Sequence, residues 1–372
     1  MRIGNTASSL ARSAIYAAAV LVMTPVTFAN ADDQLNFYNW AAYIAKDTIP
    51  NFQKQTGIRV KYDSFDSDDT LQAKLLMGNS NYDVVVTASN YMPKQIQAGL
   101  FLKLDKSKIP NLSNLDPVLM KKLADSDPGS QYGVPWAFGT DGIAYNVEAV
   151  RKALGDNAPI DSWALVFDPV RLSKLKGCGV SFVDQPSNVF ADVLQYMGKN
   201  PNSTNPNDYQ EAYETLRKVR PYITQFNSMT FDSDLAGNDI CVALGWSGGA
   251  GVARRRAIEE KRPYEIRFIN PKEGGILWFD VMAVPKDAPH PDAAMKWINY
   301  IEEPKVNAAI TNAVFYPSAN QAAQKFVVPA IASDRSIYPP EAALEKMTLL
   351  KSLPVGIMRL ENRLWLQLKT RN

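Results

Sequence analysis

The feature that most constrains the fold is an alternation of strand-like and helix-like segments near the start of the chain. Three segments predict strands, and the segments between them predict helices. The strands are expected at Leu35–Tyr38, Arg59–Phe65 and Tyr82–Val86, and the helices at Asp47–Gln55 and Thr70–Met77. A strand-helix-strand order requires parallel pairing with a helical crossover. The sequence therefore predicts an α/β fold in which a sheet is flanked by helices.

The length of 372 residues favours two lobes, because a chain of this size exceeds one ordinary hydrophobic core. The glycine-rich segment Gly133–Asn146 predicts a strand that crosses between the lobes. A second set of elements follows, with helices at Asn188–Met197 and Tyr209–Val219 and a strand at Ile240–Leu244. The segment Ile276–Val284 carries the chain back, a helix follows at Asp292–Glu302, and the tail beyond Val327 is expected to be helical. We predict residues 32–139 and 277–330 as lobe 1, residues 140–276 as lobe 2, and residues 331–372 as a C-terminal helical segment packing on the lobes.

The first 31 residues have the pattern of a secretory signal peptide. Arg2 and Arg12 precede the apolar run Ala14–Met23, and Ala29-Asn30-Ala31 has the small-x-small form of a cleavage site. No later segment approaches the roughly 20 apolar residues of a membrane span. Without the leader the chain keeps 38 basic and 38 acidic residues. We expect an exported, soluble protein with no nucleic-acid partner, since nucleic-acid binders usually carry a basic excess.

The chain has two cysteines, Cys178 and Cys241. An even count in an exported chain favours a disulfide, which would close a loop of roughly 60 residues. Two buried free thiols are the alternative.

Three loops follow the predicted parallel strands, and this edge of an open α/β sheet is where ligands bind. They are Asn39–Tyr43, Asp66–Asp69 and Thr87–Tyr91. The acidic loop Asp66–Asp69 is either a ligand or metal site or the cap of the next helix, and capping needs no further assumption. Asn90, in the third loop, is a candidate ligand contact.

Asp280 interrupts the apolar segment Ile276–Val284, and no Lys or Arg lies within five residues of it. A buried carboxylate is costly unless a cation or several hydrogen-bond donors meet it. The partner of Asp280 is either a ligand from outside the chain or a distant turn or Arg of the chain itself.

Aromatic residues gather at the predicted strand ends and loops, where several rings with a few acids suit an organic ammonium ion. Each ring alone is equally compatible with core packing. They are Tyr38, Trp40, Tyr43, Tyr91, Trp136, Trp246, Trp278, Phe279, Phe315 and Tyr316.

An enzymatic alternative comes from Gly245–Gly249, which fits the G-x-S-x-G pattern of a hydrolase with Ser247 as nucleophile. The base would be the single histidine, His290, which lies between two prolines. We prefer a reading in which these glycines let the backbone approach a ligand and Trp246 supplies a stacking face. No zinc, calcium or phosphate-loop spacing is present, so neither a metal nor a cofactor is expected.

Several short motifs spread over the chain together resemble the periplasmic putrescine/spermidine-binding proteins of ABC importers. The resemblance covers nearly the whole chain after residue 31. The motifs are Asn39-Trp40-x-x-Tyr43-Ile44, Phe65-Asp66-Ser67, Tyr82-Asp83-Val84-Val85, Leu104–Pro110, Gly142–Asn146, Cys178–Phe182, Gly237–Ala243, Pro271–Gly274 and Phe315-Tyr316.

The resemblance implies a two-lobed periplasmic binding protein of type II with its ligand in the cleft between the lobes. It also implies hinge closure, delivery of a small-molecule amine to an inner-membrane ABC permease, a periplasmic location, a monomer and a Cys178–Cys241 disulfide.

The resemblance also implies which residues contact the ligand and where this chain departs from the family. Trp40, Tyr43, Trp246, Asp280 and Tyr316 match family positions, and Trp278 stands where Phe is usual. Ala41-Ala42 replaces Ser-Asp, Ser187-Asn188 replaces acids, Gly249 replaces Asp, and Asp141 stands where Thr is usual.

These departures suggest that Asp280 is the one acid of the site and binds a single amine. The opposite end, near the amides of Gly248–Gly251 with Arg254 in reach, would then accept a neutral group or a carboxylate. A mono-amine such as 4-aminobutyrate or 5-aminovalerate, or a modified polyamine, fits this hypothesis. An ordinary putrescine or spermidine site is the alternative, favoured if Asp141 faces the cleft.

Overall fold

The computed structural model describes Met1, residues 34–156 and residues 160–370. The predicted signal peptide, residues 1–31, lies outside this range except for Met1. The strands are β1 Gln34–Trp40, β2 Arg59–Phe65, β3 Val84–Ala88, β4 Gly133–Asn146, β5 Val180–Phe182, β6 Gln225–Phe226, β7 Val242–Trp246, β8 Ile266–Ile269, β9 Ile276–Ala283 and β10 Thr348–Leu349.

Helices connect and cover these strands. The α-helices are α1 Thr48–Thr56, α2 Asp68–Leu76, α3 Met92–Gln97, α4 Pro117–Leu123, α5 Val147–Leu154, α6 Ala164–Phe167, α7 Pro169–Leu175, α8 Pro186–Tyr196, α9 Pro206–Val219, α10 Phe231–Gly237, α11 Ser247–Glu259, α12 Pro291–Ile301, α13 Pro304–Val314, α14 Pro329–Ala332, α15 Glu341–Lys346 and α16 Val355–Thr370. The 3-10 helices are η1 Lys106–Lys108, η2 Pro110–Asn114, η3 Lys176–Cys178, η4 Arg220–Tyr222 and η5 Gln321–Phe326.

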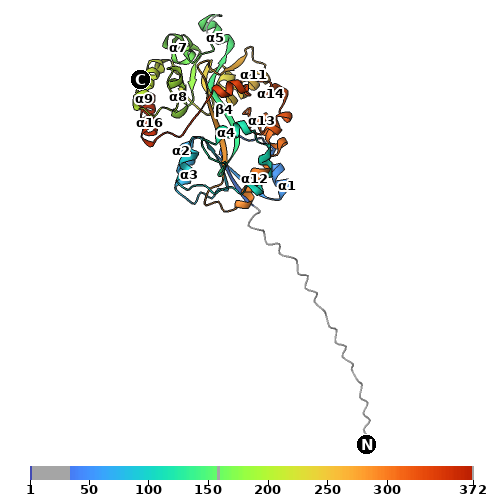
Figure 1. Cartoon of the computed structure of the whole chain (residues 1–372). Helices are drawn as coiled ribbons and strands as arrows, with labels where there is room; N and C mark the ends of the chain where they lie inside the picture. Colours follow the sequence, from blue (N-terminus) through green and yellow to red (C-terminus); the bar gives the residue numbers. More distant parts are fainter. Residues whose placement is uncertain (2–33, 157–159, 371–372) are drawn as a thin grey trace. The chain divides into compact units, whose positions relative to one another are not determined.

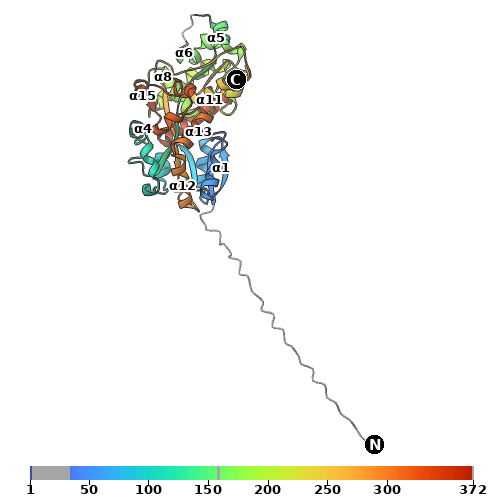
Figure 2. The same ribbon diagram turned by 90° about the vertical axis from the view of Figure 1, so that its right-hand side faces the viewer.

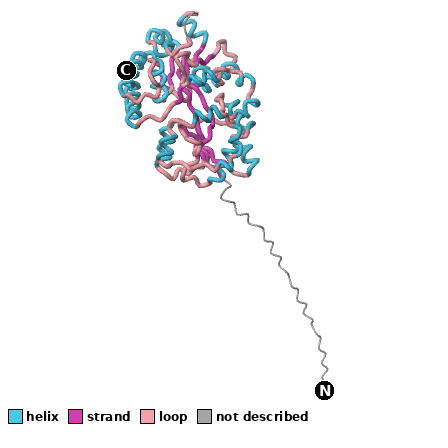
Figure 3. The backbone as a smooth tube through the Cα atoms, viewed as in Figure 1, coloured by secondary structure: helices cyan, strands magenta, loops and turns pink. Residues whose placement is uncertain are grey.

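The strands follow one path, in the order β2-β1-β3-β9-β4-β7-β5-β6, with β10 beside β9 and β8 beside β4. Strand β4 belongs to both halves of this path. Thr140 still pairs with Leu277 on β9, whereas the next residue, Asp141, pairs with Trp246 on β7. We call the half with β2, β1, β3, β9 and the start of β4 lobe 1, and the half with the end of β4, β7, β5, β6 and β8 lobe 2. Figure 3 shows the strands running through the middle of both halves, with helices outside them.

Helices cover both faces of each half because neighbouring strand residues point to opposite faces. On β1, Phe37 packs against Trp297 of α12 with ring centroids 4.9 Å apart, whereas Tyr38 packs against Phe65 on the other face at 4.7 Å. Figure 1 shows α1 and α12 on one side of the lobe 1 strands and α2 and α3 on the other. The turned view in Figure 2 shows α4 and α1 flanking the same lobe.

Each half has its own hydrophobic core. The lobe 1 core gathers apolar side chains from β1, β3, β9, α1 and α12, and the lobe 2 core gathers them from β5, β7, α8 and α9. The apolar face of α16, including Leu364 and Trp365, packs onto the lobe 2 core. The predicted lobe boundaries remain predictions, but the two cores explain why one cavity between them can be lined from both sides.

The predicted α/β architecture is confirmed, including the parallel pairing of β1 with β2 and β3. The bounds of β2 and β4 are as predicted, and most other elements shift by a few residues. The tail beyond Val327 was predicted as helices alone, which is wrong, because Thr348–Leu349 pairs with β9 as strand β10. A two-residue strand has too few positions to show any periodicity.

The disulfide between Cys178 and Cys241 is present and lies within lobe 2. It joins the end of η3 to the residue before β7, with a sequence separation of 63 residues. A loop of this length restricts the unfolded chain strongly when it is closed.

We expect removal of this disulfide to lower the free energy of unfolding by about 2–4 kcal/mol. Thermal melting of the protein with and without a reductant measures the effect, and the Cys178→Ala/Cys241→Ala double variant provides the check without reductant. An unchanged melting temperature in both experiments would contradict a stabilising role.

Candidate functional site

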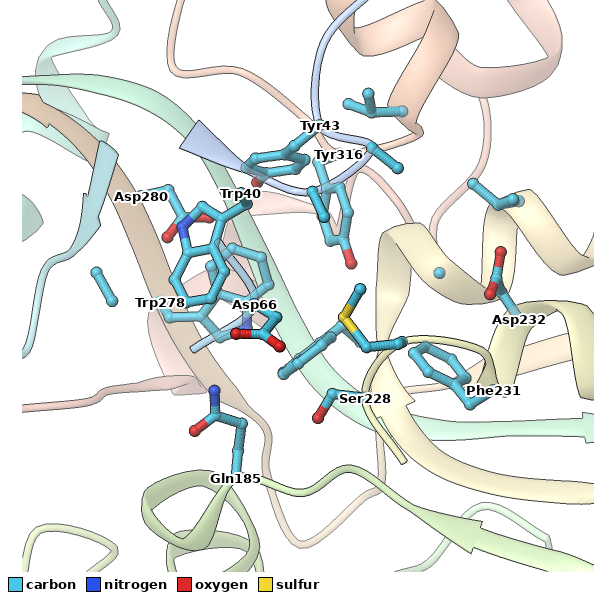
Figure 4. A pocket seen from close by; sticks show the side chains of 18 of the residues that line it. Trp40, Tyr43, Asp66, Gln185, Ser228, Phe231, Asp232, Trp278, Asp280 and Tyr316 are labelled. Atoms are coloured by element: carbon cyan, nitrogen blue, oxygen red, sulfur yellow. The ribbon is translucent and has the colours of Figure 1, made fainter. Parts of the chain in front are cut away.

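A cavity of about 380 Å³ lies where the carboxyl ends of the lobe 1 strands face lobe 2. Its walls come from both lobes, as expected for ligand sites in open α/β sheets. Of the ten ligand contacts predicted from the sequence, nine line it: Trp40, Tyr43, Asn90, Asn188, Trp246, Gly249, Trp278, Asp280 and Tyr316. Figure 4 shows Asp280 beside Trp40 and Tyr43 on one side, and Asp232 with Phe231 on the other.

The lobe 1 wall is a set of mutually packed aromatic rings. The ring centroids of Trp40, at the end of β1, and Phe65, at the end of β2, are 4.5 Å apart. Tyr316 contacts Tyr43 edge-on at 5.2 Å and Trp278 at 5.5 Å. Such rings offer negative faces to a cation and hold one another in place. Five of the ten rings noted in the sequence therefore line the cavity, whereas Tyr38, Tyr91, Trp136, Phe279 and Phe315 do not.

Glycines make room for these rings. A Cβ on Gly139 would lie 2.3 Å from the Trp278 ring, and a Cβ on Gly248 would lie 2.4 Å from the Tyr316 ring. A Cβ on Gly249 would lie 2.2 Å from the ring of Phe231, which in turn packs against Trp246 in lobe 2. Real side chains do not approach so closely, so the glycines set the shape of the walls.

Asp280 is buried in β9, with 6% of its surface exposed. Burial raises its pKa to about 7, and the Tyr43 hydroxyl and Trp40 indole N–H groups, which face the carboxylate, hold it below what burial alone would give. Neither donor reaches full hydrogen-bonding geometry with any acceptor in the described residues. No Lys, Arg or His of the described chain pairs with Asp280. The predicted alternative of a distant Arg partner is therefore wrong, and the carboxylate is available to a ligand.

The expectation that Asp280 is the one acid of the site is also wrong. Asp66, Asp68 and Asp232 line the same cavity. Asp66 and Asp68 follow β2, in one of the three loops at the ligand-binding edge of the sheet, where helix capping also explains an acidic loop. Ser67 is the residue that caps α2, by accepting a hydrogen bond from the Thr70 backbone N–H. The position of Asp68 in this loop therefore indicated a cavity residue, but the capping explanation applies to its neighbour Ser67 and not to Asp68.

Asp232 follows the short strand β6, in a segment that also places Ser228 and Phe231 on the wall. This strand has two residues and was not predicted, so nothing in the sequence marked the segment as a strand end. The same holds for Leu350, which follows β10.

Asp141 does not line the cavity and lies just behind its wall. Its carboxylate accepts a hydrogen bond of 3.0 Å from Trp278 Nε1 and one of 2.7 Å from Asn188 Nδ2. The sequence left the orientation of this candidate ligand contact open, and in the structure Asp141 does not reach the cavity surface. Burial raises the pKa of this carboxyl group to about 7, against the effect of the two donors. Asp141 holds one cavity residue from each lobe and orients both.

The arginines that line the lobe 2 side of the cavity are not Arg254, the one expected from the sequence. Arg254 pairs with Asp334 on the far side of α11, so its predicted reach into the cleft is wrong. Arg255 and Arg256 line the cavity instead. Arg255 lies over the Phe315 ring at 4.9 Å, and Arg256 forms no ion pair or hydrogen bond within the described residues.

The hydrolase alternative is not supported by the geometry. Ser247 is buried at the start of α11, where its hydroxyl accepts a hydrogen bond from the Thr140 backbone N–H at 3.4 Å. The Nδ1 atom of His290 lies 3.0 Å from Oδ2 of Asp83 in lobe 1. Ser247, Asp280 and His290 therefore do not form a triad.

Within residues 34–156 and 160–370, no group of three or more His, Cys, Asp or Glu side chains is placed to hold a metal ion. In the same residues no helix combines the length and hydrophobicity that a membrane span requires.

Comparison with known proteins gives consistent matches over most of the chain. A family model described as bacterial extracellular solute-binding protein matches residues 47–337. The putrescine-binding periplasmic protein SpuD of Pseudomonas aeruginosa is 45% identical over 336 residues, which cover 90% of this chain and 92% of that protein. The putrescine-binding periplasmic protein PotF of Escherichia coli is 44% identical over 359 residues, covering 96% and 97%.

A solved structure agrees with these matches. The spermidine/putrescine ABC transporter substrate-binding protein PotD of Streptococcus pneumoniae superimposes with a TM-score of 0.75 at 26% identity, covering 91% of this chain and 98% of that chain.

Proposed function

The chain belongs to the bacterial extracellular solute-binding proteins, in the group of periplasmic putrescine- and spermidine-binding proteins, and on this premise we propose that it captures a small diamine in the cavity between its lobes. The captured amine passes to the membrane permease of an ABC importer. The observation that carries the proposal is Asp280, a buried carboxylate among aromatic rings with no cation of the described chain beside it. An alkylammonium group supplies the missing positive charge, and the rings of Trp40 and Tyr43 surround it.

A second amine is supported by the acid on the opposite side of the cavity. Asp232 is half-buried, lines the wall next to Phe231 and forms no ion pair within the described residues. Figure 4 shows it well separated from Asp280, with Tyr316 between them. A flexible diamine of the putrescine class places one ammonium group at each acid and its methylene chain against the rings.

Ligand contacts from both lobes link binding to closure. Trp278 and Asp280 belong to lobe 1, whereas Trp246, Asn188 and Asp232 belong to lobe 2. A ligand that touches both walls gains its full set of contacts only when the lobes are closed, and it therefore favours the closed state.

An ω-amino acid is the second candidate, favoured by one observation. Arg256, on α11, lines the cavity and forms no ion pair or hydrogen bond within the described residues. A ligand with an ammonium group at Asp280 and a carboxylate near Arg256 would satisfy both charges. The acids Asp66, Asp68 and Asp232 outnumber the two cavity arginines, so the diamine fits the charge of the site better.

Calorimetric titration with putrescine and 5-aminovalerate at equal ionic strength separates the two candidates. We expect putrescine to bind at least about tenfold more tightly, a difference of about 1.4 kcal/mol, because Asp232 stabilises a second ammonium and repels a carboxylate.

Butylamine serves as the control, since it matches putrescine in chain length but lacks the second ammonium group. Tighter binding of 5-aminovalerate than of putrescine would favour the ω-amino acid. Absence of binding by all three ligands would contradict the proposed function.

A further inference from the structure

Asp68 is a buried carboxylate whose environment is not explained by the fold alone. It is the first residue of α2, has 9% of its surface exposed and lines the cavity. Its Oδ1 atom has no hydrogen-bond partner within the described residues. A buried oxygen without a partner is costly, so some other group is expected to meet it.

Capping of α2 does not account for this burial. Ser67 supplies the cap, and an acid in the first turn gains only about 0.3–1 kcal/mol from the helix dipole. Asp69, the next residue, stands in the same turn and is exposed, so it obtains this gain without being buried. The helix therefore needs neither the burial of Asp68 nor its position on the cavity wall.

The sheet register brings Asp68 into the same corner as Asp280. The backbone N–H of Ala88, at the end of β3, interacts with the Asp68 carboxylate. Ala88 stands directly opposite Asp280 in the antiparallel pairing of β3 with β9. Directly opposite residues in such a pair have Cα atoms about 4.5–5.5 Å apart, so the two carboxylates lie close to each other.

Among the described residues, the titratable groups that interact with Asp68 are acidic or neutral. Asp280 faces Asp68 from β9, Asp69 lies beside it on α2, and Tyr91 approaches from the segment after β3. Tyr43 and Trp40 face the Asp280 side. Burial, followed by the charge of Asp280, raises the pKa of Asp68 well above its usual value. Two buried carboxyl groups in one corner without a cation disfavour double ionisation, so this arrangement favours the protonated form of Asp68 in the unliganded protein.

We propose that Asp68 and Asp280 form one two-carboxylate subsite that receives the same primary ammonium group, and that Asp68 releases its proton when this group binds. The inference rests on the proposed function and specifies one end of its ligand. The Asp68 carboxylic acid loses H⁺ to solvent, and the resulting carboxylate accepts an N–H bond from the ammonium group, which keeps its own charge and protons. No other bond forms or breaks.

This subsite defines a chemical class of ligand. A primary ammonium group has three N–H donors and can bond to both carboxylates and one further acceptor. A dimethylated amine has one N–H donor and can satisfy only one of the two acids. The subsite therefore selects unmethylated primary amines.

The test is calorimetric titration with putrescine in buffers of different ionisation enthalpy, which gives the number of protons released on binding. We compare the wild-type protein, Asp68→Asn and the matched control Asp69→Asn, and confirm folding of each by thermal melting. Asp68→Asn is expected to release close to one proton fewer than wild type and to bind putrescine about 10–100-fold more weakly, since it lacks one charge of a buried contact. Asp69→Asn is expected to match wild type in both quantities.

Each result distinguishes this inference from the proposed function. Equal affinity and equal proton release in wild type and Asp68→Asn would overturn the two-carboxylate subsite while leaving the proposed function intact. Failure of the wild-type protein to bind any primary amine would overturn both. If 5-aminovalerate is the tighter ligand, the same comparison applies, because it carries the same ammonium group.

Discussion

Asp280→Asn is expected to weaken putrescine binding by about 100-fold or more, because removing one partner of a buried charge pair costs about 3–5 kcal/mol. Asn has nearly the same shape as Asp, so the aromatic walls remain in place while the ammonium group loses its anionic partner. Calorimetric titration measures the loss. Thermal melting of the unliganded variant should show no destabilisation, since the change removes a buried carboxylate that lacks a cation in the described chain.

A matched control for this variant is Asp66→Asn. Asp66 also lines the cavity but is exposed to solvent. Exposed charge pairs contribute only about 0–1 kcal/mol, so we expect affinity to change by no more than a few-fold. Wild-type affinity in Asp280→Asn would show that the amine binds elsewhere in the cavity.

Acidification is the second change with a large expected effect. The amine needs ionised Asp280, whose pKa is about 7 in the unliganded protein. About half of the Asp280 carboxyl groups are ionised at pH 7 and about one in a hundred at pH 5, so binding should weaken about 50-fold between these pH values. Release of the Asp68 proton makes the dependence steeper. Titrations at several pH values and constant ionic strength measure the slope.

Acidification should raise the free energy of unfolding of the unliganded protein, although it lowers the affinity for the amine. Burial raises the pKa of Asp280 and Asp141 to about 7 and of Glu302 and Glu361 to about 8. Between their unfolded values near 4 and these raised values, the folded state binds more protons than the unfolded state. The stabilisation that these four acids provide when protonated is therefore complete below pH 4 and is lost as pH rises through 7 to 8. Weaker binding together with a higher melting temperature at pH 5.5 would show that affinity falls because the site is protonated and not because the protein unfolds in acid. An affinity that does not depend on pH would contradict the role of Asp280.

Local patterns were sufficient to predict most of the fold. A strand-forming segment predicted β2, a glycine-rich segment with strand formers predicted β4, and the order of strands and helices predicted the parallel pairing of β1 with β2 and β3. The same topology rule placed the three loops at the edge of the sheet where the cavity lies. The Cys178–Cys241 disulfide, favoured by the even cysteine count of an exported chain and implied by the family resemblance, is confirmed.

The errors in the site concern which way individual side chains face. Strand β4 is buried along its whole length, so alternation could not tell whether Asp141 faces the cleft or the layer behind it. On α11, Arg254 and Arg256 are separated by two positions, or about 200° around the helix axis. Only the packing of the helix decides which of them reaches the cavity. Asp68 faces the site because of the register between β3 and β9, which joins segments far apart in the sequence.

The position of β9 between β3 and β4 has a consequence for the order in which the chain folds. The lobe 2 strands separate β9 from β3 in the sequence, yet β9 joins β3 to β4 in the lobe 1 sheet. A growing chain can pair β4, β5, β6, β7 and β8 while β3 still has an open, apolar edge, and such edges promote aggregation. The lobe 2 strands can therefore pair before the lobe 1 sheet is complete, which must wait for β9, whereas α16 completes the lobe 2 core later in the chain. Since Trp278 and Asp280 lie on β9, ligand binding requires the completed lobe 1 sheet.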